Sequence, residues 1–391
     1  MQSFSNKTAW QRTRTQLSEA YAQRIQAGSQ ILDLTCANPT EQGFVYSDGE
    51  LSAFWGKGAT YHPHALGIPT AREAVAQYLA HRGSHITSDG IWIGSGTSEL
   101  YAHTMSILCD PGDVWLVPQP GYPLFAYVAD LAGVPLSHYA LSWDGGWFLD
   151  ADALETIVSQ TQARALVVIS PHNPTGHVWT DAERAMVIDC CKRHDLALIV
   201  DEVFLDFPVD LETAVTSCAG TQEVLTISLS GASKVAAFPQ GKIAWAAVSG
   251  PGAEEFLARA ELVTDTFLST STVIQAGLPH LLEAAEAMQA RIRSRCRENV
   301  RVARKIVAGT ALSVCPVQAG WSMLLRFPQT HDDQKWAMLA LESEGIMTHP
   351  GYLFGMETVS NNPFLGVSLL LEPALFREGI EKLARLVIGS G

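Results

Sequence analysis

The chain has 391 residues, of which 47% are hydrophobic and 17% are charged, and its formal net charge at pH 7 is −14. This length predicts a large core and more than one domain, and the negative charge argues against nucleic acid and anionic membranes as partners. Seven cysteines without CxxC or Cys/His metal spacing indicate reduced thiols in a cytoplasmic protein, with neither a disulfide framework nor a metal site. The apolar runs are too short to cross a bilayer.

The first predicted element is a polar helix that ends at Gly28, in a stretch that lacks the apolar core of a signal peptide. From about residue 70 to 250, amphipathic helices alternate with short apolar runs rich in β-branched residues. This pattern predicts an α/β fold whose mostly parallel sheet is covered on both faces. The predicted helices are 69–82, one from Ser98, one near 123–132 and one from Thr180 to His194; the predicted strands are 91–94, 114–117, 165–170, 196–200, 224–228 and 243–248.

After residue 250 the pattern changes. A long helical region covers 273–308, and two alternating stretches, "GWSMLLRFP" and "FLGVSLLL", predict strands before a final helix, "PALFREGIEKLARLVI". These elements indicate a second, α+β domain, against which the N-terminal helix packs unless it meets a partner subunit.

Small, polar or charged residues follow five strands of the predicted sheet. They are Ser95-Gly96-Thr97, Tyr122, Asn173, Asp201 and Lys234. Ligands of an open parallel sheet bind beyond the carboxyl ends of its strands, so we expect these residues to share one site.

Each of these residues has a chemical interpretation and a structural alternative. "SGT" offers an anion the N–H groups of a helix N-terminus, or it only caps the helix. Asp201 is expected to be a buried carboxylate that needs a cation or a donor, or else a helix cap. Lys234 suits imine formation if its pKa is lowered, or it is a solvated loop lysine. Together the set fits pyridoxal phosphate, which has a phosphate, a pyridine nitrogen, a 3-oxygen, a flat ring and an aldehyde.

The motifs "YHPHALG", "SGT", "PGYP", "HNPTG", "DEVF", "SGASK" and "HPGYLFG" occur in this order along the chain. In order and spacing the sequence resembles the fold-type I pyridoxal-phosphate aminotransferases of class I/II, the aspartate-aminotransferase-like family. The resemblance covers essentially the whole chain. Any one of these motifs alone would be weak evidence, but their joint match is specific.

The resemblance implies a role for each motif. Ser95, Gly96 and Thr97 would bind the phosphate, and Tyr122 would stack on the ring. Asn173 would lie beside the 3-oxygen and Asp201 under the pyridine nitrogen, while Lys234, after Ser233, would hold the cofactor as a Schiff base. Lys242 would hold the phosphate, and Tyr61 would reach the phosphate of the neighbouring subunit.

The resemblance also implies the architecture and the reaction. The large cofactor-binding domain would cover residues 45–275, and a small domain would combine 1–44 with 276–391. A homodimer would move an amino group from an amino acid to a 2-oxo acid by a ping-pong mechanism.

The sequence departs from the family pattern at three positions. Phe204 replaces a tyrosine that donates to the 3-oxygen, and Lys242 replaces an arginine. The arginine that binds the substrate carboxylate is missing, because Gly366 or a neighbour stands at its position.

Several residues are candidates to replace the missing arginine. Arg326, His349 and Asn38 are the substrate candidates, and His62 and His64 flank Tyr61 and could line a neighbour's pocket.

Alternatives to an aminotransferase remain open at this point. They are a lyase or decarboxylase with the same cofactor, a non-catalytic relative, and a nucleotide-binding sheet. The last alternative is weak, since no GxGxxG or GxxxxGK[ST] motif follows a strand.

Overall fold

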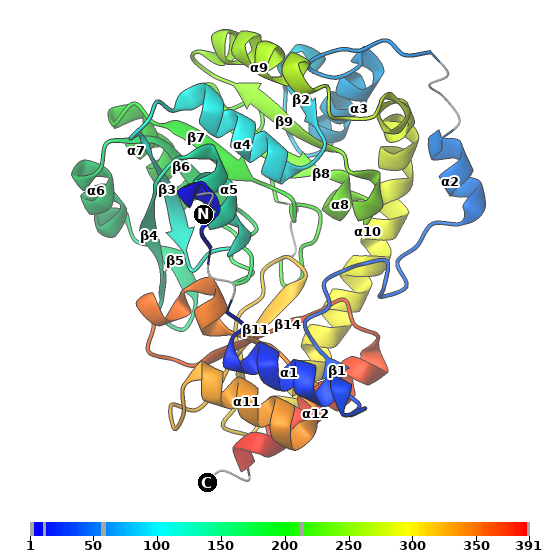
Figure 1. Cartoon of the computed structure of the whole chain (residues 1–391), viewed down its shortest axis with the longest axis vertical. Coiled ribbons are helices and arrows are strands. Elements are labelled where there is room, and N and C mark those ends of the chain that lie inside the picture. Colours follow the sequence, from blue (N-terminus) through cyan, green and yellow to red (C-terminus); the bar gives the residue numbers. More distant parts are fainter. Residues whose placement is uncertain (1–3, 11–12, 56–59, 212–214, 389–391) are drawn as a thin grey trace.

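The structure is a computed structural model that describes residues 4–10, 13–55, 60–211 and 215–388. It contains a large mixed sheet and a smaller sheet, each with helices packed against it (Figure 1). The larger sheet lies in the upper part of Figure 1 and the smaller sheet in the lower part.

The larger sheet has eight strands in the order β2-β9-β8-β7-β6-β3-β4-β5. The five strands from β8 to β4 pair in parallel, while β9 and β5 run antiparallel to their neighbours. The prediction of a mostly parallel sheet is therefore confirmed. In sheet order the bounds are Ile91–Gly94, Ala244–Ser249, Thr226–Gly231, Ala197–Asp201, Ala163–Ile169, Val114–Gln119, Leu136–Trp143 and Trp147–Leu149.

Helices cover both faces of this sheet because the central strands are apolar on both sides. One buried cluster joins the sheet to α4, α5 and α9, and another joins the opposite face to α6 and α7. The predicted helix from Thr180 to His194 begins and ends at those two caps, and Thr180 forms a capping box with Glu183. The helices are α3 (Pro69–Ala80), α4 (Thr97–Leu108), α5 (Leu124–Ala132), α6 (Ala151–Gln160), α7 (Asp181–Arg193) and α9 (Ala253–Phe267).

The smaller sheet is antiparallel, in the order β10-β11-β14-β13, and packs against α11, while α12 packs against α10 and α11. A short parallel pair, β1 with β12, brings the N-terminal segment to this part of the molecule. The bounds are β10 (Ser313–Val314), β11 (Ser322–Arg326), β14 (Phe364–Ser368), β13 (His349–Pro350), β1 (Leu32–Asp33), β12 (Ile346–Met347), α11 (Asp333–Glu344) and α12 (Pro373–Ile388).

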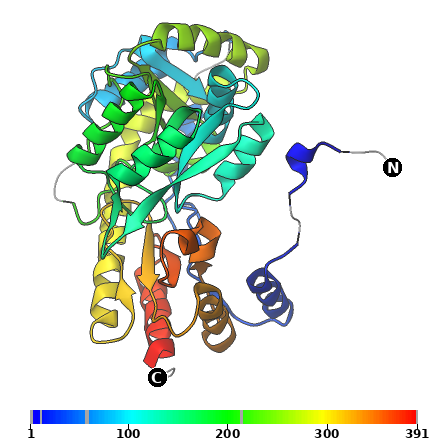
Figure 2. The same ribbon diagram turned by 90° about the vertical axis from the view of Figure 1, so that its left-hand side faces the viewer.

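The N-terminal helix α1 (Gln16–Gln26) packs against α11, on the outside of the molecule (Figure 2). The sequence left open whether this helix meets the small domain or a partner subunit, and the contact with α11 supports the first alternative. The remaining short helices are η1 (Asn6–Thr8), α2 (Asp48–Trp55), η2 (Ser88–Gly90), α8 (Ala232–Val235), η3 (Pro239–Gly241), η4 (Gly351–Phe354) and η5 (Met356–Thr358).

The long helix α10 (Thr272–Val307) connects the two sheets. It packs against α2 and α3 beside the larger sheet and against α12 beside the smaller one. The domain boundaries expected at residues 45 and 275 stay a prediction, and α10 runs through the second of them without a break. None of the helices in the described ranges is long and apolar enough to cross a membrane.

Candidate active site

The predicted site residues at the centre of the larger sheet lie on neighbouring strands. Asp201 is the last residue of β7, Asn173 follows β6, and Lys234 lies in α8 directly after β8. Because β6, β7 and β8 are parallel neighbours, their carboxyl ends reach the same edge of the sheet.

Asp201 is held by two hydrogen bonds. Its Oδ2 accepts from the Tyr101 hydroxyl at 3.0 Å, and its Oδ1 accepts from the Val203 N–H at 3.1 Å. Burial raises the pKa of Asp201, while the two donors and the charge of Lys234 lower it. The carboxylate is therefore fixed in orientation and suited to bind a protonated ring nitrogen.

Lys234 lies in an aromatic environment. Its Nζ is 5.5 Å from the ring centroid of Trp321 and 6.0 Å from that of Phe204. Burial lowers the pKa of Lys234, and the charge of Asp201 opposes this shift. Removing the amine from water favours its neutral, nucleophilic form, which imine formation requires.

The predicted phosphate-binding residues meet at the N-terminus of α4. Gly96 is the N-cap of this helix and Thr97 its first residue. A Cβ on Gly96 would lie only 3.6 Å from the Nζ of Lys242, so the lysine amine is directly beside the helix N-terminus. A cation and a positive helix end together form a cradle for a dianion. The Ser95 N–H, at 2.7 Å from Oε2 of Glu99, is already occupied.

Asn173 forms a hydrogen bond from the edge of the larger sheet to the smaller sheet. Its Oδ1 accepts a hydrogen bond from the Ser322 hydroxyl at 3.3 Å, and Ser322 is the first residue of β11. Among the described residues its amide NH2 has no protein partner, so this group can donate to a ligand oxygen. Ser233, beside Lys234, is half-buried.

Tyr122 borders a cavity of about 180 Å³ at the carboxyl ends of β3 and β6, beside the start of β4. Half of its side chain is exposed, and His138 and Phe354 also line the cavity. Tyr122 is thus accessible to a ligand in this cavity, and its stacking on the cofactor ring stays a prediction.

Tyr61 lies elsewhere on the surface and is 66% exposed. It borders a shallow hollow of about 20 Å³ together with His64 and Thr270. His62 is exposed beside it. An exposed aromatic ring at this position is available to a neighbouring subunit.

The three substrate candidates differ in their surroundings. Both polar groups of the Asn38 amide are engaged within its own loop, with Thr40 and Glu41. Arg326 is the last residue of β11 and donates to the Ser313 hydroxyl at 3.5 Å. His349 lies opposite Gly366 in the pairing of β13 with β14. The role of all three in substrate binding stays a prediction.

Three further residues contact the predicted site residues and were not identified from the sequence. Tyr101 holds Asp201, Trp321 covers Lys234, and Ser322 binds Asn173. Tyr101 could have been identified, because it lies four residues after Thr97 and so on the same face of α4. No sequence signal connects Trp321 or Ser322 to strands more than 85 positions earlier.

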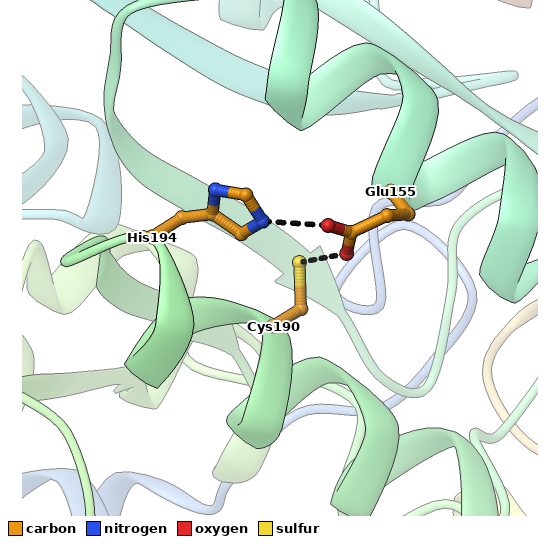
Figure 3. A group of neighbouring side chains, drawn as sticks. All are labelled: Glu155, Cys190 and His194. Atoms are coloured by element: carbon orange, nitrogen blue, oxygen red, sulfur yellow. Dashed lines mark hydrogen bonds and ion pairs between the residues drawn. The ribbon is translucent and has the colours of Figure 1, made fainter.

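A second polar cluster lies between α6 and α7, away from these residues (Figure 3). Glu155, Cys190 and His194 have ligand atoms within 4.8 Å of one another, the usual appearance of a metal site. However, Arg193 donates to both Glu155 oxygens at 2.9 Å, and burial raises the pKa of Cys190 to about 11. The cluster is therefore an ion pair that joins the two helices, with a protonated thiol beside it.

Comparison with known families identifies the chain. The model of the family "Aminotransferase class I and II" matches residues 56–383. The chain belongs to this family. It is an aminotransferase, and its cofactor is pyridoxal 5′-phosphate. The arrangement of Lys234, Asp201 and the cradle at the N-terminus of α4 fits this cofactor.

Individual relatives of the chain are also named aminotransferases. The chain is 27% identical over 344 residues to the glutamate-pyruvate aminotransferase AlaA of Escherichia coli, covering 84% of each chain. It is 32% identical over 230 residues to AlaA of Haemophilus influenzae, covering 57% of this chain and only 56% of that protein.

Solved structures share the fold of this aminotransferase. An alanine aminotransferase from Pyrococcus furiosus superposes with a TM-score of 0.88 at 17% identity, covering 99% of this chain and 100% of that one. An Escherichia coli aminotransferase gives a TM-score of 0.85 at 23% identity, covering 100% and 99%. At these identities the likeness shows the fold alone.

Proposed function

We propose that this aminotransferase moves an amino group from an amino acid to a 2-oxo acid, with Lys234 as the cofactor-binding and proton-transferring residue. The observation that carries the proposal is the pairing of a half-buried amine of lowered pKa with a fixed carboxylate, Asp201, across neighbouring strand ends. An amine and a carboxylate whose pKa values are both shifted by burial are more typical of a catalytic site than of a purely structural ion pair.

Each of the site residues would have a separate role in the reaction. Pyridoxal phosphate supplies an aldehyde that binds the amino group and a ring that accepts electrons. Asp201, oriented by Tyr101, would keep a proton on the ring nitrogen, and the N-terminus of α4 would hold the phosphate with Lys242. Lys234 would remove the proton from the α-carbon of the substrate and return it to the carbon that the aldehyde of the cofactor supplies.

The 3-oxygen of the cofactor would have one protein donor fewer than the family pattern implies. Phe204 has no hydroxyl group, and its ring packs 5.5 Å from that of Trp321. The NH2 group of Asn173 would then be the protein donor to this oxygen. A site with one donor fewer would stabilise the ionised oxygen less.

The assembly belongs to the same proposal. We propose a cytoplasmic homodimer in which Tyr61 reaches the phosphate of the partner subunit. Its support is the 66% exposure of the Tyr61 side chain and the resemblance of "YHPHALG". Because the relatives are named glutamate-pyruvate aminotransferases, glutamate and pyruvate are the first substrate pair to assay.

The test combines labelling with a substrate screen. Borohydride reduction of the holoenzyme should leave one pyridoxyl group, on the peptide that carries Lys234. Lys234→Ala should remove this label and lower kcat by several orders of magnitude, whereas Lys192→Ala, on the exposed side of α7, should change neither. A label on Lys242, or none, would overturn the assignment. Amino donors that release ammonia or carbon dioxide without an oxo acid would instead indicate a lyase or decarboxylase.

A further inference from the structure

The cradle at the N-terminus of α4 contains a carboxylate as well as a cation. Glu99 is the third residue of α4 and lies in its first turn. Its Oε2 accepts a hydrogen bond from the Ser95 N–H at 2.7 Å, and a Cβ on Gly94 would lie 3.2 Å from the same oxygen. The carboxylate therefore reaches back from the helix to the turn that precedes it.

Glu99 is negatively charged at neutral pH. Burial alone would raise the pKa of Glu99, but hydrogen bonds from the side chain of Ser269 and from Ser95 outweigh burial and lower the pKa. His103 lies four residues further along α4, on the same side of the helix. Burial lowers the pKa of His103, so its ring is neutral at this pH and does not balance the charge of Glu99.

The cation of the cradle, Lys242, is not paired with this carboxylate. A Cβ on Gly96 would lie 3.6 Å from the Nζ of Lys242. In the described ranges, however, no ion pair joins this lysine to Glu99, and its amine has no hydrogen-bond partner. The amine is free to bind a phosphate, while the negative charge of Glu99 has no cation of its own.

An anion in the cradle would lie close to Glu99. The N–H groups of Gly96 and Thr97 are expected to bind the phosphate, and consecutive residues are about 3.8 Å apart. The phosphate would therefore lie within about two residue lengths of Ser95, whose N–H group Glu99 already occupies. Like charges at this separation repel strongly enough to change a binding constant about 10- to 100-fold.

A carboxylate in the first turn also stabilises a helix by itself, and α9 offers the comparison. That helix likewise begins after a glycine, Gly252, and carries Glu254 in its first turn. Glu254 is exposed to solvent, whereas Glu99 is half-buried and bonded to a residue that is predicted to bind phosphate. The position of Glu99 thus exceeds what stabilising the helix requires.

We propose that Glu99 competes with the phosphate of the cofactor for the cradle, and so lowers the affinity of this enzyme for the phosphate group. This inference rests on the proposed function and concerns the half of the cycle in which the cofactor carries the amino group. In that form the cofactor has no covalent bond to Lys234, so only its contacts with the ring and the phosphate hold it. The weakened phosphate contact lets the aminated cofactor dissociate between the two half-reactions.

The test uses two ligands that differ only in the phosphate, pyridoxamine phosphate and pyridoxamine. Each is titrated into the cofactor-free full chain, and its Kd follows from the change in tryptophan fluorescence. Glu99→Gln keeps an acceptor for the Ser95 N–H but removes the charge. It should bind pyridoxamine phosphate about 10- to 100-fold more tightly than wild type and should change the Kd of pyridoxamine less than about 3-fold. An unchanged or weaker affinity for pyridoxamine phosphate would overturn the proposal.

The matched control is Glu254→Gln, which removes a carboxylate from the first turn of α9 and should leave both Kd values unchanged. The Tm of each variant separates competition from helix capping. A lower Tm of Glu99→Gln without a gain in affinity would mean that Glu99 only stabilises α4, against the proposal. If Glu99→Gln does not fold, Glu99→Ala serves for the same comparison, because alanine has the highest helix propensity.

Release of the aminated cofactor is the second measurement. The holoenzyme is incubated with an amino donor in the absence of an oxo acid and then passed through a desalting column. Wild type should lose most of its cofactor and Glu99→Gln should retain it, whereas equal retention would overturn the proposal. If no donor converts the cofactor, the proposed function fails, while the Kd values of the cofactor-free chain still decide the role of Glu99.

Discussion

Two consecutive carboxylates at the end of β7, Asp201 and Glu202, point to opposite sides of the sheet and have different partners. Asp201 points to the site and Tyr101, whereas Glu202 is buried on the other side, where it accepts from the Ser217 hydroxyl at 2.6 Å and the Cys218 N–H at 2.5 Å. The period of two along a strand sends neighbouring side chains to opposite faces. Glu202 therefore anchors the loop around Ser217, and burial raises its pKa to about 7.

This raised pKa predicts a pH dependence of stability. Between pH 4.5 and 7 the folded state holds a proton on Glu202 that the unfolded chain releases, so the contribution of this group is complete below pH 4.5 and is lost as pH rises through 7. The loss amounts to about 3 kcal/mol. The Tm of wild type relative to Glu202→Gln, followed by circular dichroism, should fall between pH 5 and pH 8. A constant difference would mean that Glu202 is ionised throughout this range.

At the scale of elements, α10 is the main contact of α2. A Cβ on Gly277 would lie 2.0 Å from the carbonyl oxygen of Phe54, so the α2 backbone rests directly on α10 at this glycine. Phe54 then packs edge-on against Tyr46 and Phe238.

Gly277→Ala should break the contact between the two helices. The new methyl group cannot fit without moving backbone, and overpacking of this kind typically costs about 1–3 kcal/mol. The measurement is the free energy of unfolding in urea. The control is Gly146→Ala, where a Cβ would have no neighbour within 4 Å and φ is not positive. Equal stability of the two variants would show that α2 can shift freely.

At the scale of the whole molecule, large apolar side chains remain exposed on several elements. Trp55 of α2, Leu262 and Phe267 of α9, and Tyr61 are between 49% and 72% exposed. Exposed apolar groups of this size are typical of protein–protein interfaces. They support the proposed homodimer.

The homodimer predicts complementation between two inactive variants. Lys234→Ala lacks the cofactor amine, and Tyr61→Glu places a negative charge at the partner's phosphate. Mixed and reassociated, the two should regain up to about a quarter of wild-type activity, because one site in half of the dimers is intact. Tyr61→Glu should fold normally, since the side chain is exposed. A monomer in sedimentation that is fully active would contradict this prediction.

The sequence predicts most of the larger sheet because its central strands are short, apolar and punctuated by glycine and proline. Strands β4 and β5 were not predicted, since they are only partly buried and β4 mixes polar with apolar residues. The residues at strand ends were predictable because a parallel sheet brings those ends together. The contacts of Trp321 and Ser322 were not, because they depend on how the smaller sheet docks on the larger one.

The long helix α10 packs against elements beside both sheets, so a bend in this helix would move one sheet relative to the other. Pro279 lies inside this helix and has no N–H to donate to the carbonyl of Gln275, so the helix is weakest at that turn. Beyond Pro279 it continues to Val307, about 42 Å at 1.5 Å per residue. A bend of about 5° at Pro279 would therefore move the far end of α10, and the elements packed on it, by roughly 4 Å relative to the larger sheet.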